Sequence, residues 1–106
     1  MVTARCLACR PSSPCERHFR QQVLDYARLN GWKAYFTWTS IHSPAGFPDI
    51  VLVRGPKMII AELKSETGKV TQAQDEWLAA FHQVKRLNIF CWRPEDWPLI
   101  VEALRR

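Results

Sequence analysis

Several features that would assign a chain to a membrane, secreted or disordered class are missing from this sequence. No run of about 18 apolar residues occurs in the 106 residues, so we expect no membrane-spanning helix. The N-terminus carries Arg and Cys where a secretory signal would need an apolar stretch. Internal repeats, low-complexity segments and long basic blocks are also absent. These absences favour a single domain with a cytoplasmic location.

The residues that are present suit a compact domain with an acidic partner. Hydrophobic residues make up 47% of the chain and include five Trp, which is enough for one core. Fifteen Lys and Arg against ten Asp and Glu give a net charge of +5, which is compatible with a nucleic acid. Four Cys in an intracellular chain favour free thiols or a metal site over disulfides.

The first part of the chain predicts a leader followed by a helix. Residues 1–12 show no periodic pattern, and we expect a flexible leader ahead of a domain over residues 13–106. Ser13 is a good N-cap, Pro14 fits the first helical position, and Glu16 would complete a capping box. Apolar residues then recur at helical spacing until Asn30-Gly31 supplies a stop signal.

The remainder predicts three strands, a helix, a fourth strand and a final helix. The expected strands are Trp32–Thr39, Ile50–Val53, Met58–Leu63 and Asn88–Trp92. Gly55-Pro56 would join the middle two in a hairpin. A second capping box from Thr71 to Gln74 opens one helix, and Pro94-Glu95-Asp96 opens the last. The order α-β-β-β-α-β-α favours an α/β fold with a mixed sheet flanked by helices.

Three charged residues on the predicted hairpin suggest chemistry. Side chains alternate along a strand, so Glu62 and Lys64 project together, roughly 7 Å apart, while Leu63 points into the core. The hairpin register would bring the carboxylate of Asp49 beside Glu62. Two carboxylates can hold Mg²⁺, which polarises water and accepts phosphate oxygens. Lys64 could orient that water or stabilise charge on the phosphate, and the backbone carbonyl of Leu63 could be a further ligand.

A simpler interpretation is available for the same three residues. Glu62 and Lys64 could form a surface salt bridge on an edge strand, with Asp49 capping a turn, and short motifs often mislead in this way. Two features favour the metal site instead. Gly46-Phe47-Pro48 stiffens the backbone just ahead of Asp49, and the motif falls on two adjacent strands.

A longer series of residues resembles a known nuclease family. Gly46 to Val53, followed by Ala61 to Lys69, is similar to the VRR-NUC (virus-type replication-repair nuclease) family of the PD-(D/E)XK, or restriction-endonuclease-like, superfamily. The similarity continues through Thr71, Gln74 and Trp77-Leu78 to Trp92–Trp97, and covers roughly residues 14–104. Many short proteins of this kind come from bacteriophages.

The resemblance implies roles for particular residues. It makes Asp49 and Glu62 metal ligands and Lys64 the catalytic lysine. It also places Glu16, the acidic residue of the first helix, near the metal, and matches Gln74 to a glutamine that these nucleases often carry. Both Glu16 and Gln74 also have a purely structural interpretation as capping-box residues. Relatives often have a His on the strand where this chain has Phe36.

Cysteines and histidines offer a second possible metal site. Cys6, Cys9, Cys15 and His18 have the spacing C-x2-C-x5-C-x2-H, which could complete a tetrahedral Zn²⁺ site. We expect free thiols instead, because the four ligands lie within 13 residues and the last two fall on the first helical turn. Cys91 lies in a strand pattern and is predicted to be core.

One histidine and the tryptophans are weaker candidates for the site. His42 could reach phosphate from the loop ahead of Asp49, but a lone loop His is more often solvated. The tryptophans could stack on bases. For most of them a core position is the better prediction, and these are Trp77, Trp92 and Trp97; Trp32 and Trp38 stay open.

The predicted function is therefore Mg²⁺-dependent hydrolysis of DNA phosphodiester bonds, with Mn²⁺ as a possible substitute. Stand-alone relatives suggest selectivity for branched or junction DNA in phage or bacterial replication and repair, in a bacterial cell or phage-infected host. A small domain has little surface for a branched substrate, so a homodimer is physically sensible. The alternatives are a non-catalytic DNA-binding or nuclease-accessory module of the same fold, and a sequence-specific restriction or toxin-like nuclease. A sequence-specific nuclease would usually need an added recognition domain, and 106 residues leave no room for one.

Overall fold

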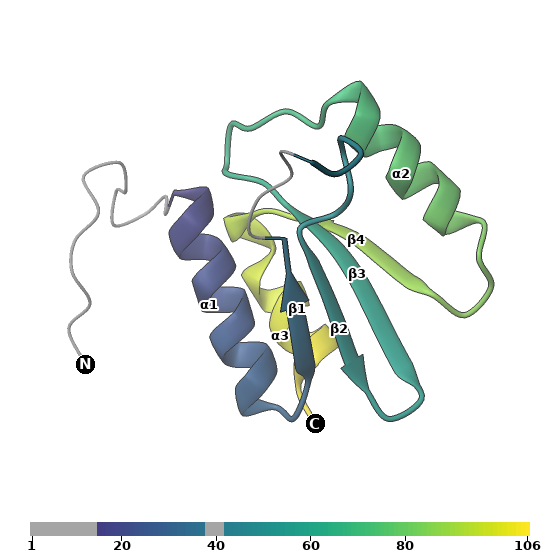
Figure 1. Cartoon of the computed structure of the whole chain (residues 1–106). Coiled ribbons are helices and arrows are strands. Elements are labelled where there is room, and N and C mark those ends of the chain that lie inside the picture. Colours follow the sequence, from purple (N-terminus) through teal and green to yellow (C-terminus); the bar gives the residue numbers. More distant parts are fainter. Residues whose placement is uncertain (1–14, 38–41) are drawn as a thin grey trace.

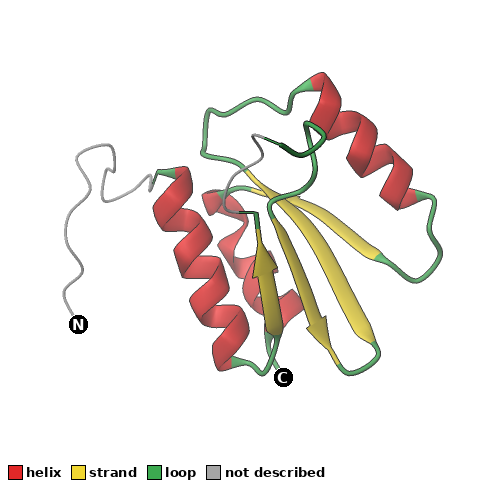
Figure 2. Ribbon diagram, viewed as in Figure 1, coloured by secondary structure: helices red, strands yellow, loops and turns green. Residues whose placement is uncertain are grey.

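A four-stranded mixed sheet flanked by three α-helices forms the protein, so the expected α/β class is confirmed (Figures 1 and 2). The computed structural model describes residues 15–37 and 42–106. The strands are β1 (Lys33–Phe36), β2 (Ile50–Arg54), β3 (Lys57–Leu63) and β4 (Asn88–Trp92). The helices are α1 (Glu16–Leu29), α2 (Gln72–His82) and α3 (Trp97–Leu104), and a 3₁₀ turn, η1 (Pro94–Asp96), leads into α3. Within these two described ranges, no helix has the length and apolar character needed to cross a membrane.

The strands lie in the order β1-β2-β3-β4, so β2 and β3 are central and β1 and β4 form the edges. The first three strands are antiparallel neighbours, and β4 runs parallel to β3. Gly55 and Pro56 connect β2 to β3, because Arg54 pairs with Lys57. Gly55 has a φ of 59°, a left-handed conformation that a residue without a Cβ adopts readily. This short turn confirms the predicted hairpin and sets the register of everything farther along it.

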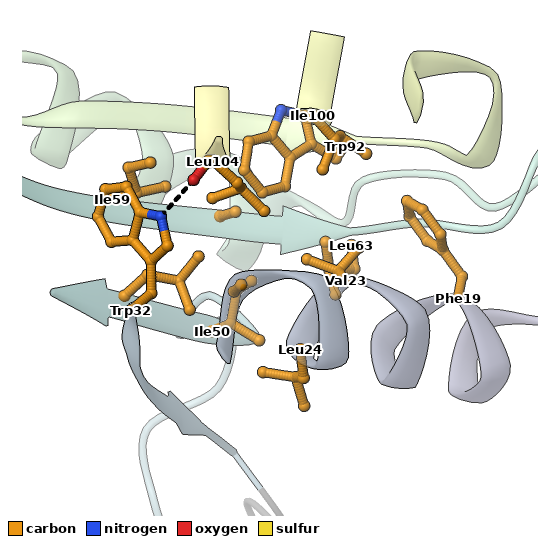
Figure 3. Packing of buried hydrophobic residues seen from close by; sticks show 13 residues of the cluster. Phe19, Val23, Leu24, Trp32, Ile50, Ile59, Leu63, Trp92, Ile100 and Leu104 are labelled. Carbon is orange, nitrogen blue, oxygen red and sulfur yellow. Dashed lines mark hydrogen bonds between the residues drawn. The ribbon is translucent and has the colours of Figure 1, made fainter. Parts of the chain in front are cut away.

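One face of the sheet packs on α1 and α3 to form the main core. Its side chains interdigitate around Trp32, Ile50 and Trp92 (Figure 3). The buried residues of this cluster are Phe19, Val23, Leu24, Ala27, Trp32, Ile50, Leu52, Ile59, Ala61, Leu63, Trp92, Ile100 and Leu104. Burial of each large side chain here contributes about 1.5–3 kcal/mol relative to exposure. This layer supplies most of the apolar stabilisation of the domain.

The opposite face of the sheet is covered over only part of its width. Helix α2 packs there through Leu78, which joins Ile60 and Ile89 in a second, smaller buried cluster. Figure 1 shows α2 on the β4 side of the sheet. We call this surface the carboxylate face, because alternation along β3 places Ile60 and Glu62 on it together.

Hydrogen bonds tie the C-terminal end of the core together. The Nε1–H of Trp32 donates to the backbone oxygen of Leu104 at 2.8 Å (Figure 3). The guanidinium of Arg54 donates to the oxygens of Asn30 and Leu104 at 3.0 and 2.9 Å, and lies 4.4 Å from the Trp32 ring centroid. Trp32, left open between core and base stacking, is therefore a core residue with a satisfied polar atom.

The structure corrects the predicted start of the first helix. Its N-cap is Cys15, without a side-chain capping bond, and Glu16 is the first helical residue rather than the third. The predicted capping box around Glu16 is therefore wrong, and its carboxylate is available for another contact. The leader over residues 1–12, the cap at Ser13 and Pro14, and Cys6, Cys9, Trp38 and Thr39 all lie outside the described residues.

Two side chains predicted to be core are not. Cys91 is exposed, because β4 is an edge strand and alternation turns this residue onto the carboxylate face, opposite Glu62. Trp77 is half-buried and packs on Phe47 and Phe81 rather than in the main core. In both cases the apolar pattern correctly predicted the strand or helix. It could not show whether a neighbouring element would cover the side chain.

Candidate metal centre

The hairpin brings Asp49 and Glu62 together at the end of the two central strands. Ile50 pairs with Ala61, so the preceding residue of β2 and the following residue of β3 lie opposite each other. The Asp49 carboxylate is held there by the backbone, because its Oδ2 accepts a hydrogen bond from the Leu63 N–H at 2.9 Å. The predicted juxtaposition of the two carboxylates is therefore present, at one end of the two central strands.

Glu16 completes a group of three carboxylates. Carboxylate oxygens of Glu16, Asp49 and Glu62 all lie within 4.8 Å of one another. Glu16 is the first residue of α1, and Figure 1 shows that α1 begins at the end of the sheet where β2 starts and β3 finishes. Three acids this close repel each other unless a proton or a cation lies between them. The grouping could therefore hold a divalent cation between its oxygens.

Lys64 directly follows β3 and lies next to the acids. Its Nζ is 3.7 Å from Glu62 Oε1, and the two side chains are 9% and 1% exposed. The alternative of a surface salt bridge on an edge strand is therefore wrong: β3 is central and both groups are buried. Leu63, between them, is fully buried in the main core, as alternation predicted. Its carbonyl leaves the strand on the same side as its N–H, which is the side of Asp49.

Gln74 caps α2, as its sequence position predicted, and also contacts Glu62. Its Oε1 accepts from the N–H of Thr71 at 2.9 Å, which completes the predicted capping box of α2. Its Nε2 donates to Glu62 Oε1 at 2.9 Å. The first bond requires an oxygen, so it fixes which way the amide lies and leaves the NH₂ group facing the carboxylate.

One atom of the site has no partner. Glu62 Oε1 is contacted by Gln74 and Lys64, but Oε2 is buried and has no hydrogen-bond partner among the described residues. Burial, followed by the neighbouring Asp49 carboxylate, raises the pKa of Glu62 to about 8, and Lys64 only partly opposes this rise. A buried carboxylate oxygen without a donor costs stability. A divalent cation with oxygen ligands would satisfy it, so the donor set fits a hard metal ion.

The loop ahead of Asp49 is braced against α2. Gly46 has a φ of 90°, and a Cβ there would collide with the backbone of Ala73 in the first turn of α2. The Nε1–H of Trp77 donates to the oxygen of Ala45 at 3.1 Å, and its ring lies 5.2 Å from that of Phe47. Helix α2 therefore positions both acids: Asp49 through this loop and Glu62 through Gln74.

Arg93 has a similar bracing role that sequence reasoning missed. One guanidinium nitrogen donates to the backbone oxygens of Ser65 and Gly68, at 2.7 and 2.6 Å. These residues form the turn that directly follows Lys64. No sequence signal separated Arg93 from the other basic residues, because its partners are backbone atoms more than twenty positions away.

The remaining candidates contribute little to this centre. His42 is exposed in the loop. Phe36 projects to the main core, where Arg20 lies 5.9 Å from its ring centroid. Of the four proposed zinc ligands, only Cys15 and His18 fall within the described residues. The arrangement can thus bind a divalent cation between carboxylates and present a lysine beside it. Comparison with protein-family models, with curated proteins and with solved structures finds no match to this chain.

Proposed function

We propose that this chain is a divalent-metal-dependent nuclease that hydrolyses DNA phosphodiester bonds, with Mg²⁺ as its metal and Mn²⁺ as a substitute. The observation that carries the proposal is the group of Glu16, Asp49 and Glu62 within 4.8 Å, with a buried and partnerless Glu62 Oε2 and with Lys64 Nζ 3.7 Å from Oε1. A purely structural cluster would be expected to satisfy its buried oxygen. Carboxylates combined with an adjacent lysine match the needs of phosphoryl chemistry.

Each residue would have a distinct task. Asp49, Glu62 and Glu16 would hold the metal, and the Leu63 carbonyl lies on the same side as a further oxygen donor. When bound, a divalent cation supplies a Lewis acid for phosphate oxygens and lowers the pKa of water. Lys64 would place its ammonium where negative charge develops on the phosphate. The Leu63 N–H and the Gln74 amide keep the two acids in position, since each holds one carboxylate oxygen.

The proposal extends to family and substrate. The element order and the Asp49, Glu62 and Lys64 placement are compatible with a restriction-endonuclease-like fold of the VRR-NUC kind, and we propose that affiliation. Branched DNA is the proposed substrate, and a homodimer is the proposed working unit, because one small domain offers little surface to a junction. The net charge of +5 supports a polyanionic partner.

The test compares cleavage by matched variants. Wild type, Asp49→Ala and Lys64→Ala are incubated with labelled linear, flapped and four-way DNA in Mg²⁺, Mn²⁺ or EDTA. Asp25→Ala and Lys57→Ala serve as controls, because both residues are exposed and lie outside the acidic group. We expect metal-dependent cleavage by wild type and both controls, and none by the site variants. If wild type and Asp49→Ala cleave DNA to the same extent in each metal, the acidic group is not catalytic. The protein would then be at most a DNA-binding module.

A further inference from the structure

The carboxylate face has an open half beside the metal centre. Helix α2 packs on the β3–β4 side of this face, whereas three large side chains on β1, the end of β2 and the start of β3 remain exposed. Tyr35, Val53 and Met58 are 62%, 41% and 39% exposed. Tyr35 is the most exposed aromatic side chain among the described residues, and so it contributes little to the core. A large ring left in water on a sheet is a candidate binding surface.

Strand register places Tyr35 close to the acids. Tyr35 pairs with Val51, which pairs with Ile60, so all three project to the carboxylate face with Glu62. The N–H of Thr37 donates to the oxygen of Asp49 at 2.9 Å, which puts Thr37 level with that acid. Tyr35 is two residues farther along β1, or roughly 7 Å. A ligand held at the carboxylates would therefore reach the Tyr35 ring within about one or two nucleotide lengths.

The charge along the same surface favours a polyanion. Lys33 follows Tyr35 on this face, pairs with Val53 and is exposed. Glu62 is the only acidic residue on β1, β2 and β3, and Lys33 is the cation of these strands that lies on this face, because Arg54 and Lys57 alternate onto the opposite one. Leading away from the metal centre, the surface thus presents an aromatic ring and then a cation. That sequence of groups matches a base followed by a phosphate, and not an apolar protein partner.

We propose that Tyr35 stacks on an unpaired base of the nucleic-acid strand whose phosphate lies at the Asp49 and Glu62 carboxylates, with Lys33 contacting a neighbouring phosphate. This inference rests on the proposed nuclease function and adds a substrate preference to it. Bases inside a duplex already stack on each other and cannot offer a face to the ring. The subsite therefore selects strands with an unpaired nucleotide beside the cut.

Binding without cleavage tests the subsite directly. A dye-labelled eight-nucleotide dT strand, an abasic strand of the same length and a short duplex are titrated with protein in Ca²⁺, and affinity is read from fluorescence anisotropy. The variants are Tyr35→Ala and Tyr35→Phe, with Leu99→Ala as the control for an exposed apolar residue on another element. Thermal melting of each variant confirms that it is folded. Light scattering of wild type and Tyr35→Ala reports the oligomeric state.

Stacking predicts a specific pattern of results. Tyr35→Ala is expected to bind the dT strand about tenfold more weakly, the scale for loss of one base-stacking aromatic, and to bind the abasic strand like wild type. Tyr35→Phe and Leu99→Ala should match wild type on both. Equal losses on dT and abasic strands, no loss on either, or a dimer that only Tyr35→Ala dissociates would each overturn the subsite. A wild-type protein that binds the dT strand in Ca²⁺ but cleaves no DNA in Mg²⁺ or Mn²⁺ would instead reject the nuclease proposal and leave the stacking result standing.

Discussion

The two ends of the sheet treat buried polar groups in opposite ways. At the end where Trp32 and Arg54 meet the last turn of α3, the indole N–H and the guanidinium both donate to backbone oxygens. At the other end, three carboxylates lie within 4.8 Å and Glu62 Oε2 has no partner. The first arrangement satisfies every polar group it buries and so stabilises the fold. The second leaves a buried carboxylate oxygen that a proton or a bound cation would satisfy, which is the cost expected of a site that could bind a cation.

The largest expected effect separates the two ends by function. Glu62→Gln should lower DNA cleavage by about 10³-fold, because a neutral amide is a poor ligand and loss of one charge-stabilising group has that scale. In EDTA, the same variant should be at least as resistant to urea as wild type, since no carboxylate is then desolvated at this position. Single-turnover rates and urea midpoints measure the two effects. Near-normal cleavage by Glu62→Gln would remove the functional distinction between the ends.

A second prediction uses pH to expose the strain at the carboxylate end. The folded pKa of Glu62, about 8, lies above its ordinary value of 4.5, so the folded state holds a proton that the unfolded state releases. Stability of the metal-free protein should therefore fall as pH rises from about 4.5 to about 8, and each unit of pKa difference corresponds to about 1.4 kcal/mol. Melting temperatures in EDTA measure the fall. Mg²⁺ should raise the melting temperature most at pH 8.

The control for this pH dependence is Glu62→Gln, which cannot release the proton. Its melting temperature should change much less over the same pH range. A wild-type curve that is flat, or that rises between these pH values, would show that the acids are already satisfied by something other than a cation.

A third prediction tests the satisfied end. Arg54→Met should lower the free energy of unfolding by about 2 kcal/mol, because it removes charge-assisted hydrogen bonds to two backbone oxygens and a cation–π contact. Cleavage per folded molecule should stay at the wild-type value. Urea unfolding and active-site titration check both points, with Arg28→Met, an exposed residue of α1, as the matched control. Loss of specific activity in Arg54→Met would mean that the two ends are coupled.

The smallest expected effects distinguish the capping of α2 by Gln74 from its contact with Glu62. Thr71→Ala removes the cap of α2 and should cost about 1 kcal/mol of stability without changing metal binding. Gln74→Ala removes the contact to Glu62 as well and should weaken Mn²⁺ binding by about tenfold, as for other groups that orient a ligand. Calorimetric titration with Mn²⁺ distinguishes them. Equal metal affinities in both variants would reduce Gln74 to a capping residue.

Local sequence patterns predicted the elements and the pairing of the two acids. The Gly55-Pro56 turn sets the hairpin register, and register alone places Asp49 opposite Glu62. Similarly, Asn30-Gly31 marks the end of α1, where Gly31 has a φ of 84°. These features depend on neighbours in the chain, so propensity and spacing were sufficient to find them.

Burial and partner choice depended on distant segments and could not be predicted. β3 is central only because β4 pairs along its second side, so the burial of Glu62 and Lys64 is invisible in their own strand. Cys91 faces outward for the complementary reason that β4 has no further neighbour. Arg93 was missed because its partners are backbone oxygens, which every residue carries.

The Gly55-Pro56 turn also constrains which insertions and deletions the hairpin could tolerate. Asp49 and Glu62 face each other only while equal numbers of residues separate each from the turn. Adding one residue to a single arm would shift the pairing by one and send one carboxylate to the opposite face of the sheet. Adding one residue to both arms would keep the acids opposite each other while moving them away from the turn. An insertion therefore preserves the acid pair only when both arms gain the same number of residues, and a library of hairpin-length variants would recover metal binding only in those members.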